Sequence, residues 1–267
     1  MKKYKYIAVI LVYRNYEDLS ECIDSMHHSI DSCRIIVVNA YYDDESLSEI
    51  EKIAQEKDCD FIPIDNKGYG YGNNAGIEYA RDHYEYDYII ISNPDIVVKK
   101  FSGENLLPGA IYAPKIIARS GKEQNPMVIK HNKLSEYLIY KGFKNNSKVL
   151  LLSGFAVSKV CTRVQGFGIN NLGKIYQAHG SFLLIHREVI DKLHPIYDPE
   201  MFLFGEEGVL ALRAFNENID TVYTTDIVVD HKEDGSMSLA DFSIDEELKK
   251  SIIYFYERYV KQPKITN

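Results

Sequence analysis

The chain has 267 residues, 45% of them hydrophobic, which is enough to bury one sizeable core. Its formal net charge is -8 and its pI is about 5.5, so we expect no nucleic-acid partner, because such partners are held by clustered lysine and arginine. Its four cysteines form no CxxC pair, and its first apolar run, residues 7–12, is far shorter than the roughly 20 residues that span a bilayer. Both features favour a cytoplasmic protein with reduced thiols.

The first hundred residues alternate between strand-like and helix-like spacing of apolar side chains, the pattern of a parallel sheet with crossover helices. Strands are predicted at residues 6–12, 34–39, 60–64 and 88–92. Helices are predicted after Leu19 and Leu47 and, behind a glycine-rich loop, over residues 74–83. That loop can bring backbone N–H groups close to anionic oxygens, although its spacing and position are not those of a dinucleotide site. This half has the organisation of a nucleotide-binding α/β unit.

Residues 101–176 show poor periodicity and many Gly, Asn, Ser and Lys residues, so we expect loops, short strands and one helix near residues 134–140. Regular spacing then returns. It predicts a strand over 181–186, a helix over 205–218, a strand over 221–229 and an amphipathic C-terminal helix over 245–260.

The tripeptide Asn93-Pro94-Asp95 directly follows a predicted apolar strand, so Asp95 lies just beyond its carboxyl end, where open α/β sheets bind ligands. A carboxylate in that place can bind a divalent cation that a diphosphate also ligates. Taken alone, proline and aspartate more often make only a turn.

Two later features can also carry chemistry. Glu206 and Glu207 open a predicted helix, where one of them can act as a general base, although acids at a helix start are as often only complements to its dipole. Their mutual repulsion can hold one pKa nearer neutrality. His231 ends a predicted strand and is a reasonable second metal ligand, although a single histidine before a turn is more often structural.

Taken together and in this order, these motifs resemble family 2 glycosyltransferases, specifically the rhamnosyltransferase-like branch of bacterial polysaccharide assembly. The resemblance covers nearly the whole chain, through residues 9–15, 66–77, 93–96, 113–116 with Gly121 and Gln124, 180–187, 202–207 with Arg213, His231 with Gly235 and Ser236, and 254–261. It implies an α/β protein of the GT-A fold, a Rossmann-like, mostly parallel mixed sheet flanked by helices. It also implies one unit over 1–267, with a nucleotide-sugar-binding half (1–100), an acceptor-binding and catalytic half (101–243) and a C-terminal amphipathic helix (244–267).

The resemblance assigns roles to individual residues. Glu207 takes the place of the catalytic base, and Asp95 and His231 that of the ligands for a divalent metal, Mg²⁺ or Mn²⁺. The nucleotide pocket maps to Val12, Tyr13, Asn39, Asn66, Gly72, Asn74, Asn93 and Asp95, and Glu206 and Arg213 map beside the base or the acceptor. This sequence departs from the family at Asn39-Ala40, where Asp-Asn is common, at Glu207 in place of Asp, and at Val209 in place of an acid. These departures leave open a changed donor or a loss of activity.

The implied function is an inverting transfer of a sugar from a nucleotide-diphosphate donor to a saccharide or lipid-linked acceptor in cell-surface polysaccharide synthesis. The resemblance favours dTDP-rhamnose and leaves UDP-hexoses open. A non-catalytic nucleotide-sugar-binding or scaffolding subunit is the alternative. A nucleotidyltransferase ranks last, because residues 13–17 lack a glycine- and lysine-rich phosphate loop. The C-terminal helix is either a core-packing element or a peripheral contact with the inner face of the plasma membrane, and a homodimer is also open.

Overall fold

The computed structural model describes residues 1–166, 173–233 and 243–262, with side chains described up to Cys161 in the first range, so Gly235 and Ser236 lie outside the described residues. Its centre is a sheet in the strand order β4-β3-β2-β6-β10-β8-β11-β7, with β9 paired to β11. The strands are β2 (Tyr6–Val12), β3 (Cys33–Ala40), β4 (Asp60–Ile64), β6 (Tyr88–Ser92), β7 (Ile96–Phe101), β8 (Ile111–Ala118), β9 (Lys174–Ile175), β10 (Phe182–His186) and β11 (Thr221–His231). Two short strands, β1 (Lys2–Lys3) and β5 (Tyr84–Glu85), pair separately.

The sheet is mixed and changes character along its width. Strands β4, β3, β2 and β6 run parallel, β10 lies antiparallel to β6 and β8, and β11 lies parallel to β8 and antiparallel to β7. The predicted parallel half is therefore confirmed. Its strand β2 is a continuous apolar run because both of its faces are buried, as is usual where helices cover a parallel sheet on two sides.

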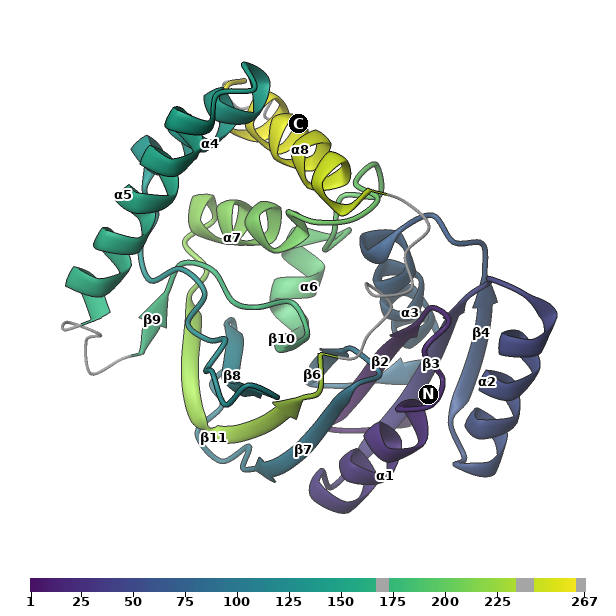
Figure 1. The fold of residues 1–267 in the computed structure, drawn as a ribbon. Coiled ribbons are helices and arrows are strands. Elements are labelled where there is room, and N and C mark those ends of the chain that lie inside the picture. The colour runs from purple at the N-terminus through teal and green to yellow at the C-terminus, as the bar shows by residue number, and fades with distance from the viewer. Residues whose placement is uncertain (167–172, 234–242, 263–267) are drawn as a thin grey trace.

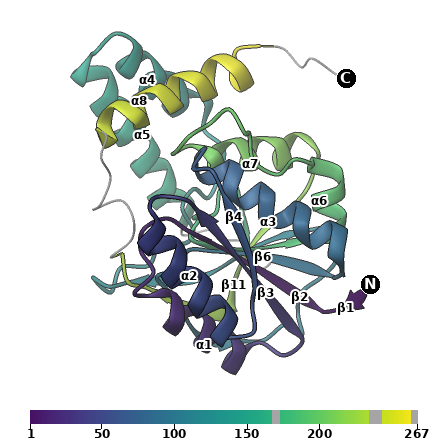
Figure 2. The same ribbon diagram turned by 90° about the vertical axis from the view of Figure 1, so that its right-hand side faces the viewer.

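Helices cover both faces of the sheet, as the two views in Figures 1 and 2 show. On one face, α1 (Leu19–Ser29) and α2 (Asp44–Glu56) pack over alternate residues of β2 and β3. On the other face lie α3 (Tyr69–His83), α6 (Arg187–Leu193) and α7 (Glu206–Asn216). The capping box of α2, in which the Asp43 carboxylate accepts from the Ser46 N–H at 2.8 Å, fixes where that helix begins.

Helix α3 begins at Tyr69, five residues before the predicted start, so Gly70 and Gly72, expected in the loop, are helical, as is Gly76 within the predicted helix. The correction has a packing cause. A Cβ atom on Gly72 would lie 2.4 Å from Leu11 Cδ1, and one on Gly76 would lie 2.4 Å from Val9 Cγ1. The glycines therefore let the helix approach β2 closely, a contact between distant segments that outweighs their poor helix propensity.

The largest error of the sequence prediction is in residues 101–176. The helix predicted near residues 134–140 is found as α4 (Lys133–Lys144), but the stretch also contains the eight-residue strand β8 and a second helix, α5 (Lys148–Gly166), which forms a hairpin with α4. Helix α5 has a long apolar run at residues 149–157, interrupted only by Ser153 and Gly154, so its sequence shows no clear period of an amphipathic helix. A Cβ atom on Gly154 would lie 2.6 Å from Ile139 Cγ1, so the two helices are held in close contact by a residue that disfavours helix in isolation.

The C-terminal helix, α8 (Ile244–Phe255), continues into a π-helical turn over Tyr256–Val260 and packs against α4. The rings of Tyr140 and Tyr256 stack with centroids 4.1 Å apart, and the Ser251 hydroxyl donates to the Leu203 carbonyl at 2.7 Å. Helices α4, α5 and α8 thus form a group at one end of the molecule (Figure 1). No helix in the described ranges is long and apolar enough to cross a membrane.

Candidate active site

A cavity of about 780 Å³ opens between the carboxyl ends of the parallel strands and the group α4, α5 and α8. Its wall brings together segments that are far apart in the sequence: the ends of β2 and β3, the turn after β6, the start of α7 and the end of β11. Of the residues predicted from the sequence, the cavity wall includes Tyr13, Asn66, Asn93, Asp95, Glu206, Glu207 and His231.

The turn that carries Asp95 is fixed on both sides by backbone hydrogen bonds. The Asn93 N–H donates to the Ser181 carbonyl at 2.9 Å, and the Lys232 N–H donates to the Asp95 carbonyl at 3.0 Å. Asp95 itself is only 2% exposed. Its carboxylate is therefore held in place by the adjoining β10 and β11 rather than carried on a mobile turn.

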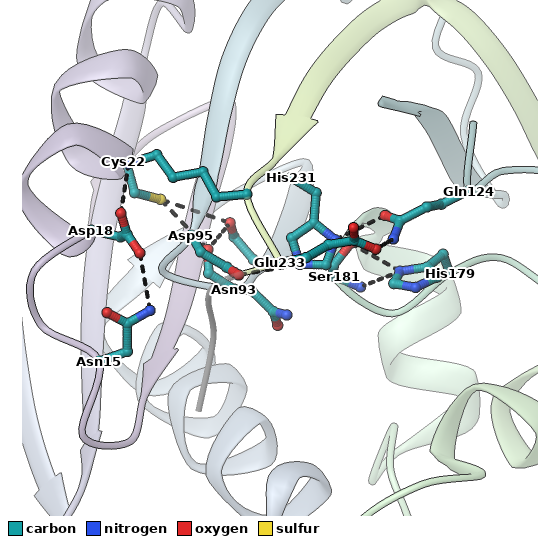
Figure 3. A network of polar contacts seen from close by, with 12 residues as sticks. Asn15, Asp18, Cys22, Asn93, Asp95, Gln124, His179, Ser181, His231 and Glu233 are labelled. Atoms are coloured by element: carbon teal, nitrogen blue, oxygen red, sulfur yellow. Dashed lines mark hydrogen bonds and ion pairs between the residues drawn. The ribbon is translucent and has the colours of Figure 1, made fainter. Parts of the chain in front are cut away.

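His231 faces Asp95 because of the register of two strands. The last residue of β11 pairs with Ile96, the first residue of β7, which immediately follows Asp95. His231 Nε2 lies 3.4 Å from Asp95 Oδ2, as Figure 3 shows. Asp95 Oδ1 is buried and has no hydrogen-bond partner among the described residues.

Gln124 orients the ring of His231. Its Oε1 lies 2.8 Å from His231 Nδ1, and its Nε2 donates to Glu233 Oε1 at 2.9 Å (Figure 3). With the amide oxygen on Nδ1, the neutral ring carries its proton there and directs the Nε2 lone pair at the carboxylate. Two acceptors then face each other, an arrangement that a bound cation stabilises, so Asp95 and His231 fit the ligands of a divalent metal.

Asp95 and His231 would make an open rather than a closed site for a metal. Within the described ranges, no group of three or more His, Cys, Asp or Glu side chains could hold a metal ion. A second histidine, His179, lies with its ring 5.7 Å from that of His231, but its Nδ1 is 2.9 Å from the Ser181 hydroxyl. Burial and the neighbouring His231 lower the pKa of His179 to about 4. Two protein ligands leave room for phosphate oxygens and water, as is usual for magnesium.

Glu206 and Glu207 lie at the start of α7, behind Gly205, whose φ of 88° is one that glycine adopts without strain. Glu207 packs against the backbone of Gly180, where an added Cβ would lie 2.6 Å from Glu207 Oε1. Glu206 is 2% exposed, and its Oε1 lacks a hydrogen-bond partner in the described part of the chain. Burial raises the pKa of both carboxyl groups, and the charge of Glu207 raises that of Glu206 further.

Four predicted site residues have contacts outside the cavity. The Val12 side chain packs in the core, and Gly72 packs on Leu11. The amide of Asn74 donates to the Tyr197 carbonyl at 2.8 Å and accepts from its N–H at 3.1 Å. Arg213 donates to the carbonyls of Pro195 and Ile196, at 2.6 and 2.9 Å. The structure thus gives these residues packing and fold-stabilising contacts and does not bring their side chains to the cavity.

Asn39 is an intermediate case. It is the next-to-last residue of β3 and pairs with Val12 of β2. It is 1% exposed, and neither the oxygen nor the nitrogen of its amide has a hydrogen-bond partner among the described residues. Buried amides are normally hydrogen-bonded, so this one is available to a ligand or to water at the strand end. Its neighbours Leu11, Tyr13 and Ala40 line the cavity.

The side of the cavity formed by α4, α5 and α8 is mostly apolar, with Glu136 and Ser158 as its polar members, and the sequence prediction missed it. It is lined by Ile139, Phe155, Leu248, Ile252, Phe255 and Tyr256. The apolar face predicted for the C-terminal helix therefore turns inward to the cavity. The signal for this side existed in the apolar run at residues 149–157, but no period showed which of its faces would be covered.

The sheet order and the polar turn after β6 define a GT-A fold. Three solved structures share it. GalNAc-T7 with UDP, GalNAc and Mn²⁺ is 12% identical with a TM-score of 0.60, and the match covers 97% of this chain and 57% of that one. The mannosyltransferase PcManGT from Pyrobaculum calidifontis with GDP-Man and Mn²⁺ is 11% identical with a TM-score of 0.51 (97% and 71% covered), and S. aureus TarS is 12% identical with a TM-score of 0.53 (96% and 46% covered). At these identities the likeness concerns the fold.

The profile of glycosyl transferase family 2 matches residues 7–159, and the chain belongs to that family. A curated relative is the low-salt glycan biosynthesis hexosyltransferase Agl10 of Haloferax volcanii, which is 25% identical over 222 residues. The alignment covers 80% of this chain and 63% of the relative, so the chain spans less than two thirds of that protein's length.

Proposed function

We propose that the protein is an inverting glycosyltransferase that moves a sugar from a nucleoside-diphosphate donor to an acceptor hydroxyl. The observation that carries the proposal is the presence of two functional pairs in one cavity: Asp95 with His231, and Glu206 with Glu207. The first pair suits a metal-bound diphosphate, and the second supplies a buried base. Membership of family 2 supports the same reaction class.

In the proposed reaction, Glu207 accepts the proton of the acceptor hydroxyl as its oxygen attacks the anomeric carbon of the donor. The bond from that carbon to the diphosphate oxygen breaks, the nucleoside diphosphate leaves with the electron pair, and the anomeric configuration inverts. We assign the base to Glu207 because it is the second acid of the family motif and lies against Gly180, next to the Ser181 backbone that holds Asn93. Glu206, with its unpartnered Oε1, is the adjacent acid, and the charge of Glu207 adds to the effect of burial in raising its pKa.

Asp95 and His231 would hold Mg²⁺ or Mn²⁺, with Gln124 and Glu233 fixing the tautomer of the histidine. When bound, such a cation neutralises the charge that develops on a departing diphosphate. Tyr13, Asn66, Asn93 and the unpartnered amide of Asn39 would contact the nucleotide. Mn²⁺ in two proteins of the same fold supports this use of the site.

For the donor we favour dTDP-rhamnose on the sequence resemblance, with UDP-hexoses as the competitor; Agl10, by its name a hexosyltransferase, supports the wider hexosyl class. For the acceptor we favour a lipid-linked saccharide, because the side of the cavity formed by α4, α5 and α8 is mostly apolar and suits a hydrocarbon chain, with its one acid, Glu136, in contact with His131. The reaction would take place in the cytoplasm, at the inner face of the plasma membrane.

A thermal-shift screen of nucleoside diphosphates and nucleotide sugars, with and without Mn²⁺ or Mg²⁺, tests donor binding, because a ligand of the folded state raises its melting temperature. Donor-consumption assays on the positive compounds then test turnover. Release of nucleoside diphosphate by the wild type and its loss in Glu207→Gln would support the enzyme. Binding without turnover would instead favour a nucleotide-sugar-binding scaffold, the alternative suggested by the departures at Asn39 and Val209.

A further inference from the structure

Helix α5 exposes an apolar face that nothing in the described chain covers. Its inner side, with Gly154 and Leu151, packs on α4. Val149 and Leu152, on the opposite side, are 73% and 70% exposed, and Val160 is 59% exposed. The helical spacing of residues 149, 152, 156 and 160 places their side chains in one stripe. Six of the thirteen exposed large apolar side chains of the described chain lie on α4 and α5.

The charge around this stripe is opposite in sign to that of the whole chain. Residues 130–163 contain seven Lys and Arg residues and one acid, Glu136, whereas the chain as a whole has a net charge of -8. Lys148 and Lys159 are exposed on α5 beside Leu152, and neither has an ion-pair partner in the described residues. The single acid faces inward, where its carboxylate contacts His131 Nε2 at 2.9 Å.

We propose that this face of α5, defined by Val149, Leu152, Ala156 and Val160 with the flanking Lys148 and Lys159, docks on an anionic lipid bilayer. Apolar side chains in a stripe with lysines at its edge are what an interfacial helix needs: the stripe enters the acyl boundary and the ammonium groups meet lipid phosphates. Figure 1 shows α5 at the outer edge of the molecule, where a flat surface can reach it.

The docked face is continuous with the cavity. Phe155, on the same helix, is 49% exposed and also lines the apolar side of the cavity, as does Ser158 one turn further on. A bilayer under α5 would therefore lie beside the mouth through which the hydrocarbon part of an acceptor enters. The link between the bilayer and acceptor entry rests on the proposed function, whereas the docking itself rests only on the surface of α5.

Charge also decides between a bilayer and a second copy of the chain. In a two-fold dimer through this face, the same patch would meet itself, and its lysines would face those of the partner without carboxylates to balance them. An anionic bilayer balances the same charges. The C-terminal helix is the weaker candidate for membrane contact, because its Ile252 and Phe255 line the cavity and so are not free to enter lipid.

The chain has no tryptophan, which permits a direct test. We would introduce a single reporter as Leu152→Trp, with Leu107→Trp as a matched control, because Leu107 is 68% exposed and lies on the loop between β7 and β8. Vesicles of phosphatidylcholine with phosphatidylglycerol should shift the emission of the Leu152→Trp variant to the blue and leave that of the Leu107→Trp variant unchanged. Vesicles of phosphatidylcholine alone should shift neither.

Co-sedimentation with the same vesicles measures the contributions of the apolar stripe and of the lysines to vesicle binding separately. The double change Leu152→Ser and Val160→Ser should weaken binding about tenfold or more, because apolar area is lost from the inserted stripe. The change Lys148→Glu and Lys159→Glu should remove the preference for phosphatidylglycerol. A wild type that does not sediment with anionic vesicles would overturn the inference. So would a blue shift of the Leu152→Trp variant without vesicles, accompanied by a doubled mass, which would assign the face to a second copy.

The thermal shift with nucleoside diphosphate keeps this inference separate from the proposed function. All four variants lie outside the cavity wall and should bind nucleotide as the wild type does. Vesicle binding without any nucleotide response would contradict the proposed function and leave the docking face intact. A nucleotide response without vesicle binding would contradict the docking face and leave the proposed function intact.

Discussion

His231 lies between two polar partners, with its Nδ1 2.8 Å from the Gln124 oxygen and its Nε2 3.4 Å from the carboxylate of Asp95. Gln124 in turn donates to Glu233 at 2.9 Å, which fixes the orientation of its amide. The side chains of four residues from three segments therefore set one lone pair against one carboxylate. The hydrogen bonds of this network fix side-chain orientation: Glu233 orients the amide of Gln124, and that amide orients the ring of His231 toward Asp95.

Replacing Gln124 should weaken metal binding more than nucleotide binding. Gln124→Leu keeps the volume but removes the acceptor at His231 Nδ1, so we expect a loss of affinity for Mn²⁺ of about 10- to 100-fold, as for other outer partners of ligating histidines. Titration of Mn²⁺ in the presence of nucleoside diphosphate measures it. Gln177→Leu, on the same cavity wall but away from the metal pair, is the control. Equal Mn²⁺ affinities for the two variants would contradict the orienting role.

Glu207→Gln should abolish most turnover while retaining the donor. The amide has the shape of the carboxylate but cannot take a proton, so we expect kcat to fall by roughly 10²–10⁴, with nucleotide affinity within a few-fold of the wild type. Release of nucleoside diphosphate measures kcat, and calorimetric titration measures nucleotide affinity. Glu206→Gln, at the adjacent position, should retain much more activity. Wild-type turnover by Glu207→Gln would contradict its assignment as the base.

Glu206→Gln should stabilise the protein increasingly as the pH rises. Because burial raises the pKa of Glu206 above the value of 4.5 that it has when exposed, the folded chain retains a proton that the unfolded chain has lost. Stability therefore falls as pH increases from about 4.5 up to the raised pKa, at about 1.4 kcal/mol for each unit of separation. Glutamine removes this loss.

Urea unfolding of wild type and variant across this pH range tests the prediction. The two free energies of unfolding should be close below the ordinary carboxyl pKa and diverge above it, with the variant more stable. Glu56→Gln, on the exposed side of α2, is the control. A difference that does not grow with pH would show that burial does not govern the ionisation of Glu206.

Gly76→Ala should destabilise the fold without a direct effect on the site. The new methyl group would lie 2.4 Å from Val9 Cγ1 and 2.9 Å from Val38 Cγ2, two stiff side chains in the core. Overpacking of this kind costs about 1–3 kcal/mol. Gly72→Ala, which meets the more flexible end of Leu11, should cost less. Thermal unfolding compares them; a larger loss at Gly72 would contradict the packing argument.

The N-terminal half of the fold could be predicted from the sequence because its signals are local. Strand β2 was predicted over residues 6–12 and is found there, since a strand buried on both faces reads as a continuous apolar run. The start of α3 and the whole of α5 could not be predicted in this way. Gly72 and Gly154 disfavour helix on their own, and only their contacts with Leu11 and Ile139 make them suitable.

The residue types of the site could likewise be identified from the sequence: a carboxylate after a strand, a pair of acids before a helix and a histidine at a strand end. Their common location could not. Asp95 meets His231 because β11 runs antiparallel to β7 in the register that pairs His231 with Ile96, and Gln124 reaches the same ring from the chain after β8. The sequence by itself determined which side chains could serve as base or metal ligand. The pairing of distant strands decided which of these side chains meet, because a one-residue shift of the β11–β7 register would turn His231 to the other face of the sheet.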